Sequence, residues 1–174
     1  MNQLQDLGGE EMAVRRATRE DLPGILEIYN HAVLHTTATY DYEPRTLEQR
    51  TAWFETHEAE GYPVFVVCGG TGMVMGWSSL NRHHDRPGYR FTAENSIYVA
   101  ESFRGRGLGG RLMAPLIEAA LEKRLRTILA VIDAQNEASL RLHRRYGFET
   151  AGLLKQVGYK FDRWLDVVFM QRMV

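Results

Sequence analysis

A glycine-rich segment at residues 104–110 constrains the fold of this chain more than any other feature. It lies between a strand-like run at residues 96–99 and a run with helical apolar spacing at residues 112–121. Glycines let the backbone turn with its N–H groups facing inward, and the following helix adds its positive end. The segment therefore predicts an anion-binding loop that can hold a pyrophosphate without a metal. Its members are Arg104, Gly105, Arg106, Gly107, Leu108, Gly109 and Gly110.

The composition indicates one domain without a strongly charged partner. With 174 residues, 44% of them hydrophobic, the chain is long enough for one substantial core but too short for two enzyme domains. Its net charge of −1 favours neither nucleic acid nor an anionic membrane as a partner. Cys68 is the single cysteine, which excludes an internal disulfide and fits a reducing cytoplasm. No apolar run reaches the roughly 18 to 20 residues that span a bilayer.

The order of the predicted elements is that of a mixed α/β domain. We expect a flexible N-terminal extension at residues 1–12, with no signal-peptide pattern, and a single cytoplasmic domain at residues 13–174. Because Pro115 lies inside one helical run, we expect that helix to bend or to begin late. The predicted order is strand 14–17, helices 22–33 and 46–60, hairpin strands 64–68 and 73–80, a polar loop 81–91, strand 94–99, helix 112–121, strand 127–132, helix 136–143 and a strand pair within 157–173.

The glycine spacing alone leaves the identity of the anion open. Gly105, Gly107 and Gly110 fit the G-x-G-x-x-G pattern of dinucleotide-binding proteins, and Asp133 ends the next strand, where such proteins place a ribose-binding acid. An NAD-binding oxidoreductase is therefore one alternative. The predicted hairpin disfavours it, because a dinucleotide fold has a βαβ unit at that place. A Walker A phosphate loop is excluded, since no Lys-Ser or Lys-Thr pair follows the glycines.

The same segment also resembles the GCN5-related N-acetyltransferase (GNAT) family. Residues 104–109 read Arg-x-x-Gly-x-Gly, and the resemblance extends over nearly all of the chain from Val14 onward. Three further stretches, residues 28–33, 92–99 and 160–166, are similar to the phosphinothricin and methionine sulfoximine N-acetyltransferases. The resemblance implies an α/β acyl-CoA N-acyltransferase fold. Its central, mostly antiparallel sheet contains a splayed parallel strand pair and is flanked by helices.

By this resemblance the co-substrate is acetyl-CoA, and no metal is involved. In the family, the strand before the loop pairs with the pantetheine arm, and the loop amides hold the pyrophosphate. The implied acceptor is the α-amine of a small amino acid or analogue, such as methionine sulfoximine, methionine sulfone or phosphinothricin, and the implied assembly is a homodimer. The implied cofactor-binding residues are Ile97, Tyr98, Val99 and Asn136 for the pantetheine region, and the seven loop residues for the phosphates.

Glu94 and His143 are the predicted catalytic residues. An alkyl ammonium has a pKa of roughly 10, so the acceptor must lose a proton before it attacks the thioester. Glu94 begins the strand beside the loop, and we assign it as the general base, directly or through water. By the resemblance, His143 lies where many relatives place a tyrosine, and it can be an acid, a second base or a structural residue. A backbone N–H near Tyr98 and Val99 is expected to bind the thioester oxygen.

The polar loop before Glu94 is expected to bind the acceptor. Guanidinium groups there can hold a carboxylate through two hydrogen bonds. The methionine sulfoximine group carries a Trp-Arg pair where this chain has His83 and His84, so a different small amino acid stays open as the acceptor. The histidine pairs at positions 31 and 35 and at 83 and 84 lack a third ligand, so no metal site is expected. The candidate substrate-binding residues are Arg82, His84, Tyr89, Arg90 and Glu94.

Two further alternatives remain from the sequence. The acceptor can be another small amine or a peptide N-terminus, and a non-catalytic acyl-CoA sensor would keep the loop without turnover. Glu94 and His143 favour an enzyme over a sensor. The sequence therefore predicts an acetyl-CoA-dependent N-acetyltransferase for a small-molecule amine. It is expected to be a cytoplasmic homodimer with no nucleic-acid or membrane partner.

Overall fold

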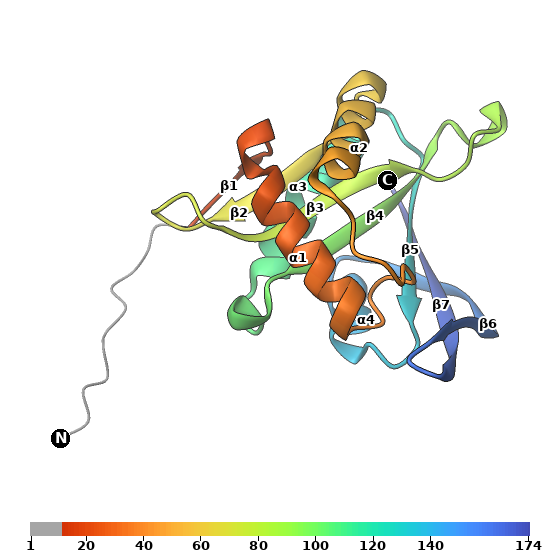
Figure 1. The fold of residues 1–174 in the computed structure, drawn as a ribbon. Helices are drawn as coiled ribbons and strands as arrows, with labels where there is room; N and C mark the ends of the chain where they lie inside the picture. The colour runs from red at the N-terminus through yellow and green to blue at the C-terminus, as the bar shows by residue number, and fades with distance from the viewer. Residues whose placement is uncertain (1–11) are drawn as a thin grey trace.

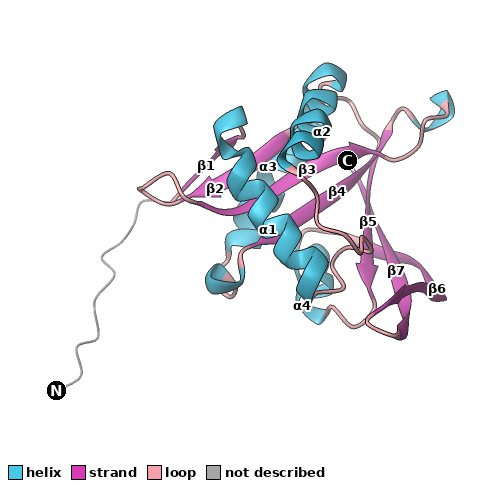
Figure 2. Ribbon diagram, viewed as in Figure 1, coloured by secondary structure: helices cyan, strands magenta, loops and turns pink. Residues whose placement is uncertain are grey.

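The computed structural model describes residues 12–174, which form a sheet with helices on both faces (Figures 1 and 2). Residues 1–11, most of the predicted N-terminal extension, lie outside the described part of the chain. The strands are β1 (Ala13–Arg16), β2 (Val64–Cys68), β3 (Val74–Arg82), β4 (Thr92–Val99), β5 (Thr127–Asp133), β6 (Glu149–Lys160) and β7 (Arg163–Met173). The helices are α1 (Leu22–His35), α2 (Leu47–Glu60), α3 (Leu108–Glu122) and α4 (Glu137–Arg145), with short 3-10 turns η1 (Arg19–Asp21), η2 (Pro87–Tyr89) and η3 (Glu101–Phe103).

The sheet of the described chain contains one parallel strand pair. Its seven strands have the order β1-β2-β3-β4-β5-β7-β6, and each neighbouring pair is antiparallel except β4 and β5. That pair is in register only from Thr92 to Glu94 on β4 and from Thr127 to Leu129 on β5, after which the two strands separate. The predicted α/β fold with a splayed parallel pair is thus confirmed.

Alternating side chains of the central strands pack into two apolar layers. On β2, Val64 and Val66 belong to the layer under α1 and α2, while Phe65 and Val67 belong to the layer under α3 and α4. This alternation is why the sheet needs helices on both faces, as Figure 1 shows. The first layer is completed by Leu22, Ile25, Ile28 and Phe54, and the second by Leu108, Leu112, Met113, Leu116 and Leu140.

The start of α3 differs from one expectation. The helix begins at Leu108, directly after Gly107, and continues through Pro115, so the prediction of a late start was wrong. An interior proline costs roughly 3 kcal/mol. The fully buried side chains of Leu108, Leu112 and Leu116 each contribute about 1.5 to 3 kcal/mol, which outweighs that cost.

Two strand boundaries also differ from the sequence prediction. β6 begins at Glu149, well before residue 157. The sequence prediction missed this part of the strand because its side chains are almost all exposed, so no apolar alternation marks it. β3 continues to Arg82 and β4 begins at Thr92, so the loop between them is shorter than residues 81–91. The longer β6 and β7 form a hairpin that extends the sheet beyond β5.

A half-buried ion pair between Arg15 and Asp21 fixes the junction between β1 and α1, and its loss should reduce stability. Asp21 is 4% exposed and accepts hydrogen bonds from the Arg15 guanidinium at 2.7 and 2.8 Å and from the Thr18 N–H at 2.7 Å. Burial acts to raise the pKa of Asp21, but these donors outweigh it and the pKa is lowered. We expect Asp21→Asn to lower the free energy of unfolding by about 1 to 3 kcal/mol at pH 7.

The sign of the shift sets the pH dependence of this loss. Because the folded-state pKa of Asp21 is depressed, its contribution is present above the ordinary aspartate pKa of about 3.9 and is lost as the pH falls through the folded value. Urea denaturation of the wild type and of Asp21→Asn should therefore give curves that converge as the pH falls below about 4. An undiminished difference at low pH would contradict this account.

Candidate active site

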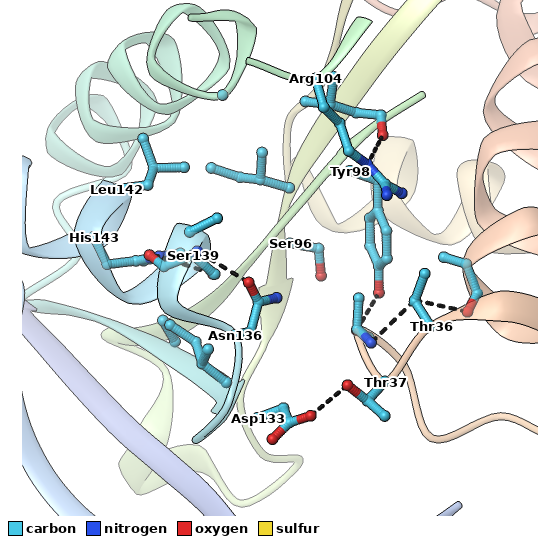
Figure 3. Close-up of a pocket in the computed structure, with 18 of the residues that line it drawn as sticks. Thr36, Thr37, Ser96, Tyr98, Arg104, Asp133, Asn136, Ser139, Leu142 and His143 are labelled. Carbon is cyan, nitrogen blue, oxygen red and sulfur yellow. Dashed lines mark hydrogen bonds between the residues drawn. The ribbon is translucent and has the colours of Figure 1, made fainter. Parts of the chain in front are cut away.

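A cavity of about 780 Å³ opens where β4 and β5 separate. Its walls come from the C-terminal end of α1, the α1–α2 loop, β4, the glycine-rich loop, β5 and α4. Figure 3 shows side chains from these elements pointing into the same space from opposite sides. The cavity thus lies at the point in the sheet where pairing between the two parallel strands stops.

The glycine-rich loop forms one end of the cavity. Gly105 and Gly107 both have a φ of 77°, which glycine adopts without strain, and a Cβ at either position would meet no atom within 4 Å. Gly109 and Gly110 permit close packing instead, since a Cβ there would come within 3.0 Å of side chains from α4 and its C-terminal cap. At the start of α3 the N–H groups of Leu108 and Gly109 have no intrahelical partner, whereas that of Gly110 donates to the carbonyl oxygen of Gly107 at 3.1 Å. The loop therefore has the shape and polarity of a pyrophosphate-binding site.

The two loop arginines lie in different environments. Arg104 lines the cavity, and its Nε donates a hydrogen bond to the carbonyl oxygen of Val99 at 3.3 Å. Arg106 is not part of the lining, and its guanidinium lies over the ring of Phe103, 5.2 Å from the ring centroid. Of the seven loop residues predicted to bind phosphates, the structure therefore brings all except Arg106 to the cavity.

The free part of β4 and the start of α4 form the side walls. Ile97, Tyr98 and Val99 line the cavity beyond the last residue pair between β4 and β5. Asn136 caps α4, since its Oδ1 accepts a hydrogen bond from the N–H of Ser139 at 3.1 Å. Figure 3 shows this side chain at the cavity wall, between α4 and β4. The four residues predicted to contact pantetheine are thus brought together.

Asp133 closes the cavity from the side of β5. Its carboxylate accepts a hydrogen bond from the Thr37 hydroxyl (Figure 3) and another from the N–H of Gln135 at 3.0 Å. Asp133 is 4% exposed and ties the α1–α2 loop to β5. The Asp133 carboxylate is already hydrogen-bonded within the protein, and the sheet of the described residues has one parallel strand pair. These two observations exclude the dinucleotide-binding alternative.

His143 contacts the cavity as a buried, neutral imidazole. Its Nδ1 lies 2.8 Å from the carbonyl oxygen of Ser139, which can only accept, so the proton resides on Nδ1. Its Nε2 lies 2.9 Å from the Asn95 amide nitrogen and accepts a hydrogen bond from it. Burial lowers the pKa of His143, which favours the neutral form. This arrangement disfavours the predicted role as an acid and leaves the roles of second base or structural residue.

Glu94 lies beside the cavity but not in its lining. It is the last residue of β4 paired with β5, directly before Asn95, which does line the cavity. Its Oε1 is 2.5 Å from Nδ1 of His83. The Glu94 side chain is 34% exposed, so water reaches it. This position suits proton transfer through water better than direct contact with a group inside the cavity.

The other predicted acceptor-binding residues lie outside the cavity. Arg82 pairs with Glu60, with 2.8 Å between Nη2 and Oε1. Arg90 is exposed, and its guanidinium lies over a neighbouring aromatic ring, 4.4 Å from the centroid. The rings of His84 and Tyr89 contact each other with centroids 5.1 Å apart. None of these four residues lines the cavity.

The polar groups of the cavity are hydrogen-bonding groups rather than a metal cluster. Within residues 12–174, no three His, Cys, Asp or Glu side chains come together as metal ligands. The cavity instead presents the loop amides, the Ser96 hydroxyl, the Asn136 amide and the Arg104 guanidinium. Among the described helices, none is long and apolar enough to cross a membrane.

Comparison with known proteins identifies the family. A family model described as the acetyltransferase (GNAT) domain matches residues 11–149, and the chain belongs to this family. It is an N-acetyltransferase whose acyl donor is acetyl-CoA. The resemblance seen in the sequence is thus confirmed.

Three similar proteins illustrate the activities named within this family. The chain is 46% identical over 159 residues to an L-methionine sulfoximine/L-methionine sulfone acetyltransferase of Pseudomonas aeruginosa, a match that covers 91% of this chain and 92% of that protein. It is 37% identical to a GNAT superfamily phosphinothricin acetyltransferase of Sinorhizobium meliloti solved in complex with AcCoA, with a TM-score of 0.91 and coverage of 94% and 88%. A ribosomal-protein-alanine N-acetyltransferase from Brucella melitensis is 44% identical, with a TM-score of 0.90 and coverage of 93% and 99%.

Proposed function

We propose that this enzyme transfers the acetyl group of acetyl-CoA to the α-amine of a small amino acid or analogue. Methionine sulfoximine, methionine sulfone and phosphinothricin are the acceptors to test first, because relatives at 46% and 37% identity carry these names. The observation that supports the proposal most is the cavity at the β4–β5 splay. A glycine-rich loop lies at one end of it, and Glu94 lies beside it.

The proposed placement of acetyl-CoA follows from the polarity of the walls. The first N–H groups of α3 and residues Gly105 to Gly110 would hold the pyrophosphate, with Arg104 beside them. Ile97 to Val99 pair with β3 on one side only, and their free edge on the β5 side would pair with the amides of the pantetheine arm. The Asn136 amide would donate a hydrogen bond to the same arm. Arg106, which is outside the lining, would contribute charge near the phosphates rather than contact.

In the proposed mechanism the amine attacks the thioester directly. Glu94 accepts a proton from the acceptor ammonium through a water molecule, and His143 has the structural role of holding the Asn95 side chain at the cavity wall. The amine nitrogen then forms a bond with the acetyl carbon while a backbone N–H near Tyr98 and Val99 donates to the carbonyl oxygen. As the carbon–sulfur bond breaks, the nitrogen loses its second proton to water and the thiolate takes up a proton from water, which leaves the amide and the free thiol of CoA. No acyl-enzyme forms, because Cys68 is buried in β2 under the α1–α2 layer.

The test is a thiol-release assay across a panel of acceptors. The panel contains free amino acids, sulfoximine and phosphinic analogues, polyamines and peptides with free N-termini. We expect the highest kcat/KM for the free amino acids and their analogues. A preference for peptides would instead match the ribosomal-protein-alanine acetyltransferase that is 44% identical, and it would overturn the proposed substrate class.

We also propose that the chain is a cytoplasmic, single-domain homodimer without nucleic-acid or membrane partners. Its domain would span residues 13–174, and its net charge of −1 gives no attraction to anionic polymers. Support for the dimer comes from large apolar side chains that the β6–β7 hairpin leaves exposed. They are Leu153, Leu154, Val157, Tyr159, Phe161 and Trp164.

Trp164 offers a test of the dimer, because it is 63% exposed within this apolar surface. We expect the wild type to elute at twice the chain mass of 20.0 kDa in size-exclusion chromatography with light scattering, and Trp164→Glu at the monomer mass. Leu121→Glu, an exposed position on α3 away from the hairpin, is the matched control and should stay dimeric. A monomeric wild type would contradict the proposed homodimer.

A further inference from the structure

A second cavity lies on the α1–α2 face of the sheet. It has a volume of about 370 Å³, within the range of about 300 to 1,000 Å³ that is typical of small-molecule sites. Residues of α1, α2, β3 and β4 line it, among them Tyr29, Trp53 and Trp77. Ser96 and Tyr98 line both this cavity and the one at the splay. The two cavities therefore adjoin each other across β4.

Arg50 of α2 lies in the wall of this second cavity, and its position is unusual for an arginine. It is only 5% exposed, and its guanidinium carbon lies 4.3 Å from the ring centroid of Tyr29, 4.6 Å from that of Trp53 and 5.5 Å from that of Trp77. Its Nε is buried without a hydrogen-bond partner among residues 12–174. A buried guanidinium is thus surrounded by aromatic faces.

The nearby carboxylate does not neutralise this charge. Asp41 also lines the second cavity, but its Oδ2 accepts hydrogen bonds from Arg45 at 2.8 Å and from the Tyr29 hydroxyl at 2.7 Å. No carboxylate of residues 12–174 forms an ion pair with Arg50. Burial lowers the pKa of Arg50, yet a guanidinium stays protonated at neutral pH. A buried cation without an anion is costly, so a cavity beside it is suited to an anionic ligand.

We propose that Arg50 binds the α-carboxylate of the acceptor amino acid, which occupies the second cavity with its amine directed toward Ser96. This inference rests on the proposed function. The carboxylate and the amine of an amino acid are attached to the same carbon, so one site can hold both groups near the shared wall of the two cavities. The planar guanidinium matches a carboxylate through two hydrogen bonds. The arginines of the polar loop are less suited, since Arg82 is paired with Glu60 and Arg90 is exposed.

This assignment makes Arg50 the residue that separates free amino acids from peptides. In a peptide the N-terminal residue carries an amide where a free amino acid carries the carboxylate. A buried guanidinium that meets a neutral amide stays without its counter-charge, which disfavours binding. The enzyme should therefore prefer methionine sulfone over the carboxamide of methionine sulfone.

The test compares Arg50→Met with the wild type on these two acceptors. Methionine keeps an unbranched apolar stem between the aromatic rings but removes the charge. We expect the KM for methionine sulfone to rise about 10- to 50-fold, because charge-assisted hydrogen bonds are lost. The KM for acetyl-CoA and the kinetics with the carboxamide should change less than about twofold, so the preference for the acid disappears. Arg50→Lys should retain part of that preference.

Arg16→Met is the matched control, since Arg16 lies over the ring of Phe65 at 5.4 Å and lines neither cavity. It should keep the wild-type preference. Thermal unfolding of each variant with and without methionine sulfone supplies a second measurement. The acceptor should raise the melting temperature of the wild type and of Arg50→Lys but not of Arg50→Met.

The outcomes separate this inference from the proposed function. If the wild type acetylates no free amino acid, the proposed function is wrong. If the wild type acetylates methionine sulfone and a folded Arg50→Met keeps the preference for the acid, the proposed function stands and Arg50 does not bind the carboxylate. If Arg50→Met is unfolded, a loss of the preference in a folded Arg50→Gln supports the inference, and a retained preference overturns it.

Discussion

Glu94→Gln is expected to lower kcat by about 10²- to 10⁴-fold, the usual contribution of a general base. The α-amine of the acceptor has a pKa of about 8 or higher, so most of it arrives protonated at neutral pH and must lose a proton. Asp133 is buried and already hydrogen-bonded, whereas the Glu94 carboxylate beside the splay is 34% exposed, which lets water relay the proton. Glutamine keeps the shape of the side chain and can still contact His83, but it has no basic oxygen.

Steady-state kinetics with both substrates varied would measure this effect. The KM for acetyl-CoA should be unchanged, since Glu94 is not in the lining of that cavity. Glu101→Gln is the matched control, because Glu101 is 70% exposed and its 3.2 Å contact with His31 is remote from the polar loop. It should keep wild-type turnover. A folded Glu94→Gln enzyme with kcat within about twofold of wild type would rule out Glu94 as the base.

Local sequence signals were sufficient for most of the fold. The helix predicted at residues 46–60 is present as α2, which begins with a capping box of Thr46 and Gln49 and ends at Gly61 with a φ of 68°. The apolar run from Val64 to Cys68 predicted a strand, and the structure has one that is buried on both faces. β6 was largely missed because its exposed residues carry no periodic pattern, and its place is set by pairing with β7.

The residues of the candidate site also differ in whether a local sequence signal indicates them. The glycine-rich loop and Asn136 were predictable because each acts through its own backbone and its immediate neighbours. The contact between Thr37 and Asp133 joins residues 96 positions apart, so no local pattern indicates it. Arg50 reads as an ordinary polar residue of α2, and its burial depends on rings from α1 and β3. Arginines of the polar loop were more visible in the sequence but are exposed or already paired in the fold.

Gly107→Val is expected to raise the KM for acetyl-CoA by about 100-fold or more, because loss of two charge-assisted hydrogen bonds to phosphate is worth about 3 to 6 kcal/mol. Gly107 has a φ of 77° and open space beside it, so a valine there strains the loop and fills the space proposed for the pyrophosphate.

Gly72→Val is the matched control, because it introduces the same backbone strain outside the proposed phosphate site. Gly72 has a φ of 80°, a Cβ there would meet no atom within 4 Å, and the residue lies in the turn between β2 and β3, away from the cavity. Both variants should lose about 1 to 3 kcal/mol of stability from the strained residue, measured by urea denaturation. Acetyl-CoA binding, measured by calorimetry, should weaken only in Gly107→Val, and equal affinity in the two variants would place the pyrophosphate elsewhere.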